Sequence, residues 1–261
     1  MSRGGGLRRD DDFFVGYLPV PEGLARFLRR AVVALALLAI AVAAILAAGQ
    51  RPLGSGEFEF GVERELEGVL RAEPLPALWI SAAASDGGPT LEVVPLVGQG
   101  KHGPSAAVLA LAGQEVRLVG SWIRRGERRL FEVARAEAVA SPSGGAGAAT
   151  PPHELGRATL AGEIVDSKCY LGVMKPGEGK SHKDCAIRCI SGGSPAALVA
   201  RDGAGLALVA LLVTPEGRPL GPELLDVVAE PVEVDGELLA LGELTLFATS
   251  RSAVRRLGEG G

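Results

Sequence analysis

The sequence predicts a mainly β protein, in which an N-terminal transmembrane helix is followed by two small β domains. The second domain is expected to carry a short helix with cysteine and histidine residues. Composition is the first reason, because 37 glycines and 17 prolines among 261 residues favour short strands joined by turns. The second reason is one long apolar run near the N-terminus. The third is a strand pattern that occurs twice at a constant offset.

The apolar run covers residues 31–49, AVVALALLAIAVAAILAAG, and contains no charged residue. Nineteen helical residues rise by about 28 Å, which is close to the thickness of the hydrocarbon core of a bilayer. An apolar circumference without a break disfavours a buried core helix in a chain of this size. A cleaved signal peptide usually has a shorter apolar run, of about 7–15 residues. We therefore expect an uncleaved, single-pass anchor that contacts membrane lipid through Ala31–Gly49.

Basic residues near the run predict its orientation. Six arginines precede the run, and only Arg51 and Arg64 follow it within twenty residues. Under the positive-inside rule, the leader at residues 1–30 lies in the cytoplasm and residues 50–261 lie on the other side of the membrane. In a bacterial cell this describes an inner-membrane protein whose β domains are periplasmic.

Turn-rich segments divide the extracytoplasmic part of the chain. Residues 141–153, SPSGGAGAATPPH, combine small residues, glycine and proline without periodicity, which is typical of a linker. We expect a first β domain at 50–140, a linker at 141–156, a second β domain at 157–253 and a disordered tail at 254–261. Strand-like runs occur at 115–119, 130–133, 161–165, 196–200, 206–213, 231–234 and 244–249.

The two β domains share a pattern that can be counted in the sequence. The pattern V-x-Φ-x-G-x-x-Φ-x-x-G-E-x-x-L-F-x-x-x-R, with Φ aliphatic, begins at Val116 and recurs 116 residues later at Val232. Nearer the start of each domain, Leu66 and Gly68 recur as Leu160 and Gly162, with an offset of 94. The second copy is therefore longer by 22 residues between these blocks, and all the cysteines lie in that interval.

The order of these strands resembles an OB-like barrel, a small five-stranded Greek-key β-barrel. An early strand opens on Φ-x-G, and a later V-x-Φ-x-G strand runs into a hairpin. In this fold the loop after the first strand is a common place for binding residues. We expect two OB-like barrels, the second of which carries its cysteine and histidine residues in that loop.

All three cysteines of the chain, Cys169, Cys185 and Cys189, lie in one segment together with His182. Their spacing is C-x(12)-H-x(2)-C-x(3)-C. The histidine and the last two cysteines stand at i, i+3 and i+7, positions that share one face of a helix.

A short helix is predicted over about residues 182–190. Ser181 and Asp184 have the spacing of a capping box, and Gly192–Gly193 would end the helix. The loop at 170–180 is rich in turn residues. If this loop folds back, the first cysteine reaches the sulfur atoms on the helix.

Three thiolates and one imidazole can close a tetrahedral Zn(II) site, and thiolates also suit Cu(I). We predict a site for one ion with Cys169, His182, Cys185 and Cys189 as ligands. Asp166 would either orient the imidazole or cap a turn. Two alternatives stay open. One is a structural disulfide with a spare thiol, for which an i,i+4 cysteine pair is a poor choice. The other is a thiol activated by the histidine.

Several basic residues surround this segment, and two interpretations of them stay open. They either raise the local positive potential, which favours thiolates, or form a solvated face. These residues are Lys168, Lys175, Lys180, Lys183 and Arg188. The isolated His102, in GKHG, is expected to be a solvated loop histidine.

The cysteine segment resembles a motif of uncharacterised exported and membrane-anchored bacterial proteins, roughly G-x-V-V-D-x-x-C-Y, then H-x-x-C-A-x-x-C, then G-G-x-P. The matching residues are Gly162, Val165, Asp166, Cys169, Tyr170, His182, Cys185, Ala186, Cys189, Gly192, Gly193 and Pro195. The resemblance covers about forty residues of the chain. It implies an extracytoplasmic Cys/His domain and implies no reaction.

These patterns favour a membrane-tethered metal-binding module, an accessory or structural part of a membrane or respiratory assembly, over an enzyme. A non-enzymatic scaffold with a disulfide and a thiol redox protein are the alternatives. A net charge of −4 and few aromatic residues give no indication of nucleic-acid binding. Because the sequence has no phosphate loop, nucleophile elbow, HExxH or dinucleotide motif, no small-molecule substrate is predicted.

Overall fold

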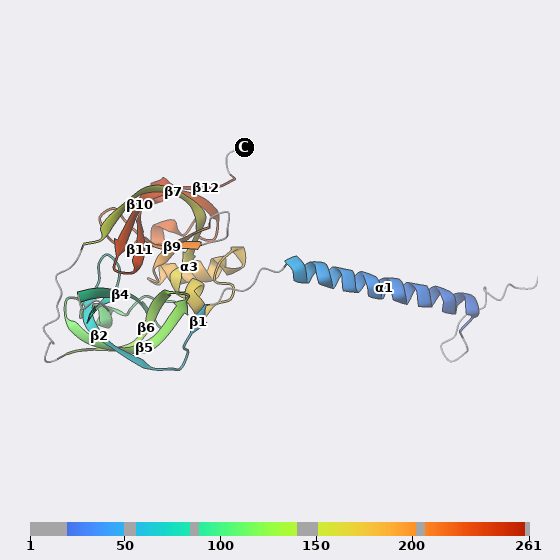
Figure 1. Ribbon diagram of the computed structural model, residues 1–261, viewed down its shortest axis with the longest axis horizontal. Helices are drawn as coiled ribbons and strands as arrows, with labels where there is room; N and C mark the ends of the chain where they lie inside the picture. Colours follow the sequence, from blue (N-terminus) through green and yellow to red (C-terminus); the bar gives the residue numbers. More distant parts are fainter. Residues whose placement is uncertain (1–19, 50–55, 84–88, 140–150, 202–206, 259–261) are drawn as a thin grey trace, which may run out of the picture. The chain divides into compact units, whose positions relative to one another are not determined.

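A computed structural model describes residues 20–49, 56–83, 89–139, 151–201 and 207–258. The chain divides into two compact units, one up to Pro52 and one from Leu53 onward. The first unit contains the apolar helix, and the second contains both β domains (Figure 1).

The apolar run forms one helix, α1 (Glu22–Gly49), of 28 residues. Its most apolar window has a mean hydropathy of 2.9, and the helix is long and apolar enough to cross a membrane. The helix begins at Glu22 and not at Ala31, so the second part of the predicted leader is helical. Leucine, alanine and arginine in residues 22–30 have high helix propensity, and the acidic first turn suits a helix N-terminus.

The first β domain is a closed barrel of five strands. These strands are β2 (Arg64–Arg71), β3 (Ala77–Ala83), β4 (Pro89–Gly98), β5 (Glu115–Arg125) and β6 (Arg128–Ala138). Their order is β5-β2-β3-β4-β6, and β6 pairs with β5 to close the ring. Only the β4–β6 pair within the ring is parallel. Strand β1 (Glu57–Phe58) adds to β5, and α2 (Ala106–Leu109) precedes β5.

The second β domain repeats this topology. Its strands are β7 (His153–Asp166), β8 (Ala196–Arg201), β9 (Ala207–Val213), β10 (Pro231–Leu241) and β11 (Leu244–Ala248). The ring runs β10-β7-β8-β9-β11 and closes through β11–β10, again with one parallel pair, β9–β11. A short η4 turn (Pro222–Leu224) precedes β10, and η5 (Arg251–Ala253) and β12 (Val254–Arg256) follow β11. Two closed OB-like barrels confirm the predicted fold class.

The repeated glycines lie where backbones approach closely. A Cβ on Gly120 would lie 2.0 Å from the Glu132 carbonyl oxygen, and one on Gly236 would lie 2.6 Å from that of Ala248. The hairpin glycines of the two copies, Gly126 and Gly242, have φ of 58° and 57°. Glycine adopts this left-handed conformation without a steric penalty. The repeated glycines therefore correspond to the same backbone bends in both barrels.

The strands extend past two predicted boundaries. β7 begins at His153, within the predicted linker at 141–156, because its first residues pair with the end of β10 across an irregularity in the strand register at Leu238–Leu239. β12 occupies part of the predicted tail at 254–261, because it pairs with β10 and buries Val254. Residues 141–150 lie outside the described residues.

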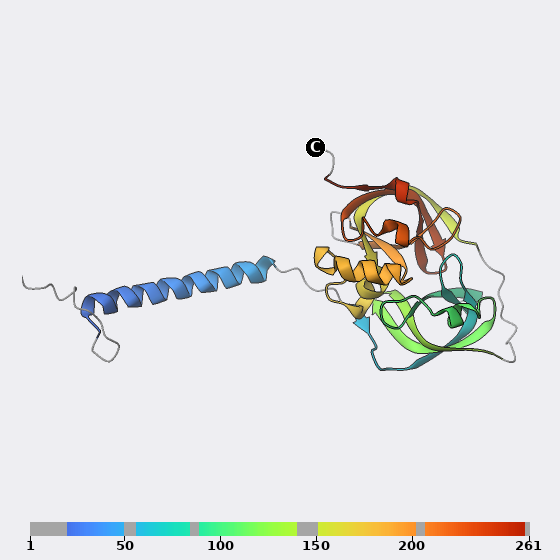
Figure 2. The ribbon, with the colours of Figure 1, turned by 180° about the vertical axis from the view of Figure 1, so that it is seen from behind.

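The two barrels lie side by side (Figures 1 and 2), and a shared apolar core packs them against each other. This core joins Val93 and Ile123 of the first barrel to Val199 and Leu241 of the second. On β8, alternate side chains face this shared core and the interior of the second barrel, so Ala196–Ala200 is buried on both faces. This two-sided burial explains why the strand is an uninterrupted apolar run. The barrel interiors form two further clusters.

Candidate metal centre

The cysteine segment is the connection between β7 and β8, residues 167–195, where the first barrel has only residues 72–76 between its corresponding strands. It contains a π-helical turn, η2 (Cys169–Val173), a 3-10 turn, η3 (Lys180–His182), and helix α3 (Lys183–Ser191). The loop after Cys169 folds back as predicted. The first cysteine therefore meets the two cysteines on α3.

The three sulfur atoms converge. The Sγ atoms of Cys169, Cys185 and Cys189 all lie within 4.8 Å of one another, and those of Cys169 and Cys185 are 3.9 Å apart. Neighbouring sulfurs in a tetrahedral site with bonds of about 2.3 Å are about 3.8 Å apart. Cys169 and Cys189 are buried, Cys185 is half-buried, and all three are free thiols. The cluster could hold one metal ion with little rearrangement of the sulfurs.

His182 lies in a second group, which shares Cys169 with the first. Ligand atoms of Asp166, Cys169 and His182 lie within 4.8 Å of one another, and all three residues are buried. His182 Nε2 is 3.0 Å from Asp166 Oδ2, and the other carboxylate oxygen accepts a hydrogen bond from Cys169 N at 2.8 Å. Asp166 therefore fills both roles predicted for it. The four predicted ligands come to one region in two overlapping groups.

Helix α3 begins one residue later than predicted and without the predicted cap. His182 occupies the N-cap position and makes no side-chain capping bond, so the capping box of Ser181 and Asp184 is wrong. The η3 turn leads directly into the helix, and the His182 ring turns to Asp166. The predicted end is confirmed, because Gly192 is the C-cap and Gly193 has φ of 95°.

The first barrel contributes a residue that sequence reasoning missed. Lys101, in the loop after β4, places Nζ 2.6 Å from Cys185 Sγ. This hydrogen bond raises the pKa of Lys101. Because 84 positions separate the two residues, no local spacing signals the contact. The adjacent His102 is exposed, as expected.

Lys168 holds that loop in place. Its ammonium is buried and donates to the carbonyl oxygens of Gly98 at 2.6 Å and Gly100 at 2.7 Å, and it also forms an ion pair with Glu132. The interpretation of Lys168 as part of a solvated face is therefore wrong. The charge of Lys168 is matched by groups of the first barrel.

Two contacts that involve glycine residues complete the interface between the barrels. Gly103 N donates to Gly192 O at 2.8 Å. A Cβ on Gly192 would lie 2.0 Å from the Lys101 carbonyl oxygen. Glycine at the end of α3 is therefore required for the close approach of the loop that carries Lys101.

The thiols are electrostatically unequal. The hydrogen bond from the Cys169 thiol lowers the pKa of Cys189, and the charge of Lys101 acts in the same direction. The same hydrogen bond, followed by burial, raises the pKa of Cys169. Ionisation is therefore easier at Cys189 than at Cys169. A soft cation that displaces this proton would find a partly charged site with two buried sulfurs.

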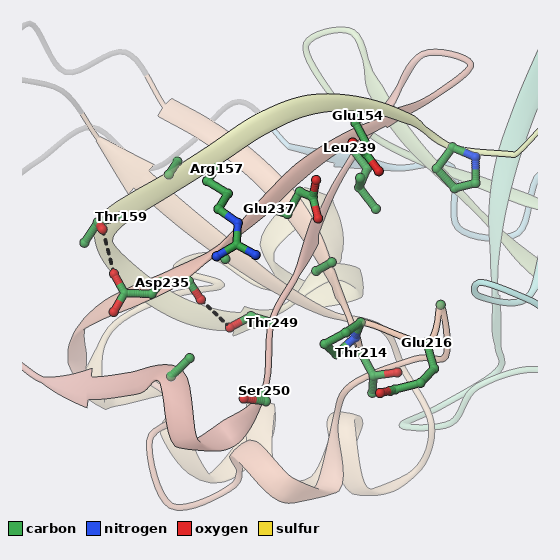
Figure 3. Close-up of a pocket in the computed structure, with 17 residues that line it drawn as sticks. Glu154, Arg157, Thr159, Thr214, Glu216, Asp235, Glu237, Leu239, Thr249 and Ser250 are labelled. Atoms are coloured by element: carbon green, nitrogen blue, oxygen red, sulfur yellow. Dashed lines mark hydrogen bonds between the residues drawn. The ribbon is translucent and has the colours of Figure 1, made fainter.

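A separate pocket, with a volume of about 890 Å³, lies in the second barrel. It lies between β7, β10 and the segment after β9, and Figure 3 shows the Arg157 guanidinium between Asp235 and Glu237. Asp235 accepts a hydrogen bond from Thr159 at 2.6 Å and pairs with Arg255 at 3.3 Å. Asp235 is already matched in charge and hydrogen bonding, so the thiol cluster is the stronger candidate for function.

Comparisons of this chain with protein-family models, with curated proteins and with solved structures return no match.

Proposed function

We propose that this protein is a membrane-tethered, extracytoplasmic metal-binding module whose cysteine cluster holds one soft ion, Zn(II) or Cu(I). The observation that carries the proposal is the convergence of three free sulfurs, two of them buried, at the spacing of metal ligands. Soft thiolates select these ions over Mg(II) and Ca(II). The resemblance of the cysteine motif to exported bacterial proteins supports the extracytoplasmic placement.

The position of the cluster supports a structural or accessory role and not an enzymatic one. The sulfurs lie where the second barrel meets the Lys101 loop of the first, so a bound ion would strengthen a join between barrels. The long apolar helix α1 supports a single-pass tether. Its arginine-rich N-terminal flank supports an orientation with the N-terminus in the cytoplasm. A partner in a membrane or respiratory assembly fits this arrangement.

Metal analysis of the full-length chain in detergent tests the proposal. We expect about one equivalent of Zn or Cu by mass spectrometry, and three titratable thiols after chelation and denaturation. Cys189→Ser should lose the ion, because it removes a buried sulfur from the cluster. His102→Ala is the matched control and should retain the ion, because His102 is an exposed residue of the Lys101 loop.

A metal-free protein with a single titratable thiol would contradict the proposal and support a scaffold with a structural disulfide. Equal metal content in Cys189→Ser and in the unmodified chain would also contradict it. Circular dichroism of each variant separates loss of the ion from loss of the fold.

A further inference from the structure

The three cysteines differ in access to solvent. Cys169 and Cys189 are buried, whereas Cys185 is half-buried. Its sulfur is also the one in contact with Lys101, an exposed residue whose ammonium can stabilise negative charge on Sγ. A dissolved oxidant would therefore reach Cys185 before the other two sulfurs.

A second thiol is placed to react with an oxidised Cys185. Cys169 Sγ lies 3.9 Å away, on a different element, and a disulfide requires an approach to about 2.05 Å. Cys189 is a poorer partner for Cys185, because both lie on α3 and an i,i+4 pair holds its Cβ atoms about 5–6 Å apart. An exposed thiol with a neighbouring resolving thiol is the arrangement of redox-sensing cysteines.

We propose that Cys185 is a site of oxidation by hydrogen peroxide and that Cys169 resolves it to a disulfide. In the first step Cys185 Sγ attacks peroxide, the thiol gives up its proton and the O–O bond breaks. One oxygen stays on Sγ as a sulfenic acid, and the other leaves as water after taking a proton. In the second step Cys169 Sγ attacks Cys185 Sγ, an S–S bond forms and the S–O bond breaks. The oxygen leaves as a second water with the Cys169 proton, so two electrons pass from sulfur to peroxide.

The disulfide would control the metal site, and this consequence rests on the proposed function. Oxidation removes two of the three sulfurs as ligands, which leaves Cys189 alone and releases the ion. Lys101 contributes directly to this scheme, because its ammonium contacts the sulfur that reacts.

The test treats the chelated, full-length chain in detergent with hydrogen peroxide and maps the products by peptide mass spectrometry. We expect a loss of two hydrogens, a fall from three free thiols to one, and a single cross-link between the peptides of Cys169 and Cys185. Dithiothreitol should restore all three thiols. Cys169→Ser should instead accumulate a sulfenic acid on Cys185 that dimedone traps.

Matched lysine variants test the role of Lys101. Lys101→Met should slow the oxidation by about threefold to tenfold, as expected for the loss of one hydrogen bond to a charged group at a partly exposed site. Lys175→Met, an exposed lysine of the same segment as the cysteines, should leave the rate unchanged.

Several results would overturn the proposal. One is a cross-link that joins Cys189 to either partner. Another is a Lys101–Cys185 adduct that gains one oxygen and loses two hydrogens. A third is a rate of Cys185 oxidation by hydrogen peroxide that is no faster than the rate for free glutathione. A chain that forms the Cys169–Cys185 disulfide but binds no metal when reduced would refute the proposed function and leave the oxidation site standing.

Discussion

At the scale of single residues, Lys168 shows how a charged side chain is accommodated in the interior of the protein. Its side chain is only 2% exposed, yet its ammonium meets two backbone carbonyl oxygens and Glu132. A buried charge is tolerated when it is paired and hydrogen-bonded. The sequence places Lys168 next to Cys169 and gives no sign that its partners lie in the other barrel.

Replacing Lys168 with methionine should destabilise the protein by about 3 kcal/mol, because Glu132 would be left without its partner. Urea unfolding of the full-length chain, followed by circular dichroism, measures the change. Lys175→Met, an exposed lysine, should change the free energy of unfolding by less than about 0.5 kcal/mol. The double variant Lys168→Met/Glu132→Leu should recover part of the loss. No recovery would show that the Glu132 charge is not the cause.

The candidate site was predictable only in part at this scale. The helical period brings Cys185 and Cys189 to one face, and the turn-rich loop predicts that Cys169 joins them. The orientation of His182 was predicted only as one of two alternatives, because Asp166 could either orient the ring or cap a turn. In the structure Asp166 makes both contacts.

His182→Ala distinguishes two arrangements of the ion. If the three sulfurs alone hold the ion, the variant should keep about one equivalent of metal. Its affinity for the metal should fall by only about tenfold, because the imidazole would then act only as a neighbour that orients the groups around the ligands. Competition with a chromophoric chelator measures this affinity. A loss greater than about a thousandfold would indicate that the imidazole is itself a ligand, as the spacing predicts. Cys189→Ser provides the reference for loss of a ligand.

At the scale of elements, the strand pattern was predictable because each copy repeats the same bends. The pattern beginning at Val116 falls on β5 and β6, and its recurrence at Val232 falls on β10 and β11. In this pattern, Gly120 and Gly236 are constrained by close backbone approach within one hairpin, and Gly126 and Gly242 by their positive φ. The contact of the loop after β4 with α3 was not predictable, since it joins segments far apart in the chain.

Gly192→Ala should disturb that contact. The φ of Gly192 is −83°, which alanine adopts freely, so the cost arises from the Lys101 carbonyl oxygen 2.0 Å from the added Cβ. We expect a destabilisation of about 1–3 kcal/mol in urea unfolding. The exposed neighbour Ser191→Ala is the control, with a change below about 0.5 kcal/mol. Equal effects of the two substitutions would argue against a tight join at this point.

At the scale of the whole molecule, the two barrels behave as one packed body and not as separate domains on a linker. Residues from Leu53 onward form one compact unit, with an apolar core shared between the barrels. The sequence did not predict this packing. In a run such as Ala196–Ala200, the sequence does not distinguish the apolar residues that face the barrel interior from those that face the other barrel.

Metal removal should therefore lower the melting temperature of both barrels together. If the ion is present at about 100 times its dissociation constant, chelation removes about 2.7 kcal/mol of stabilisation. For a unit of this size the melting temperature should fall by about 5–10 °C in a single transition. Scanning calorimetry of the full-length chain measures it, and Cys189→Ser should not respond to the chelator. Two separate transitions would contradict the shared core.

The glycine contact between residues 103 and 192 also bears on the history of the chain. One barrel has a short connection at this point, and the other has a long one that rests against the first barrel. Replacing either barrel with a homologous barrel should disrupt this contact. In related chains, substitutions in residues 98–103 should therefore accompany substitutions in residues 192–193, and the two copies should be inherited as a pair.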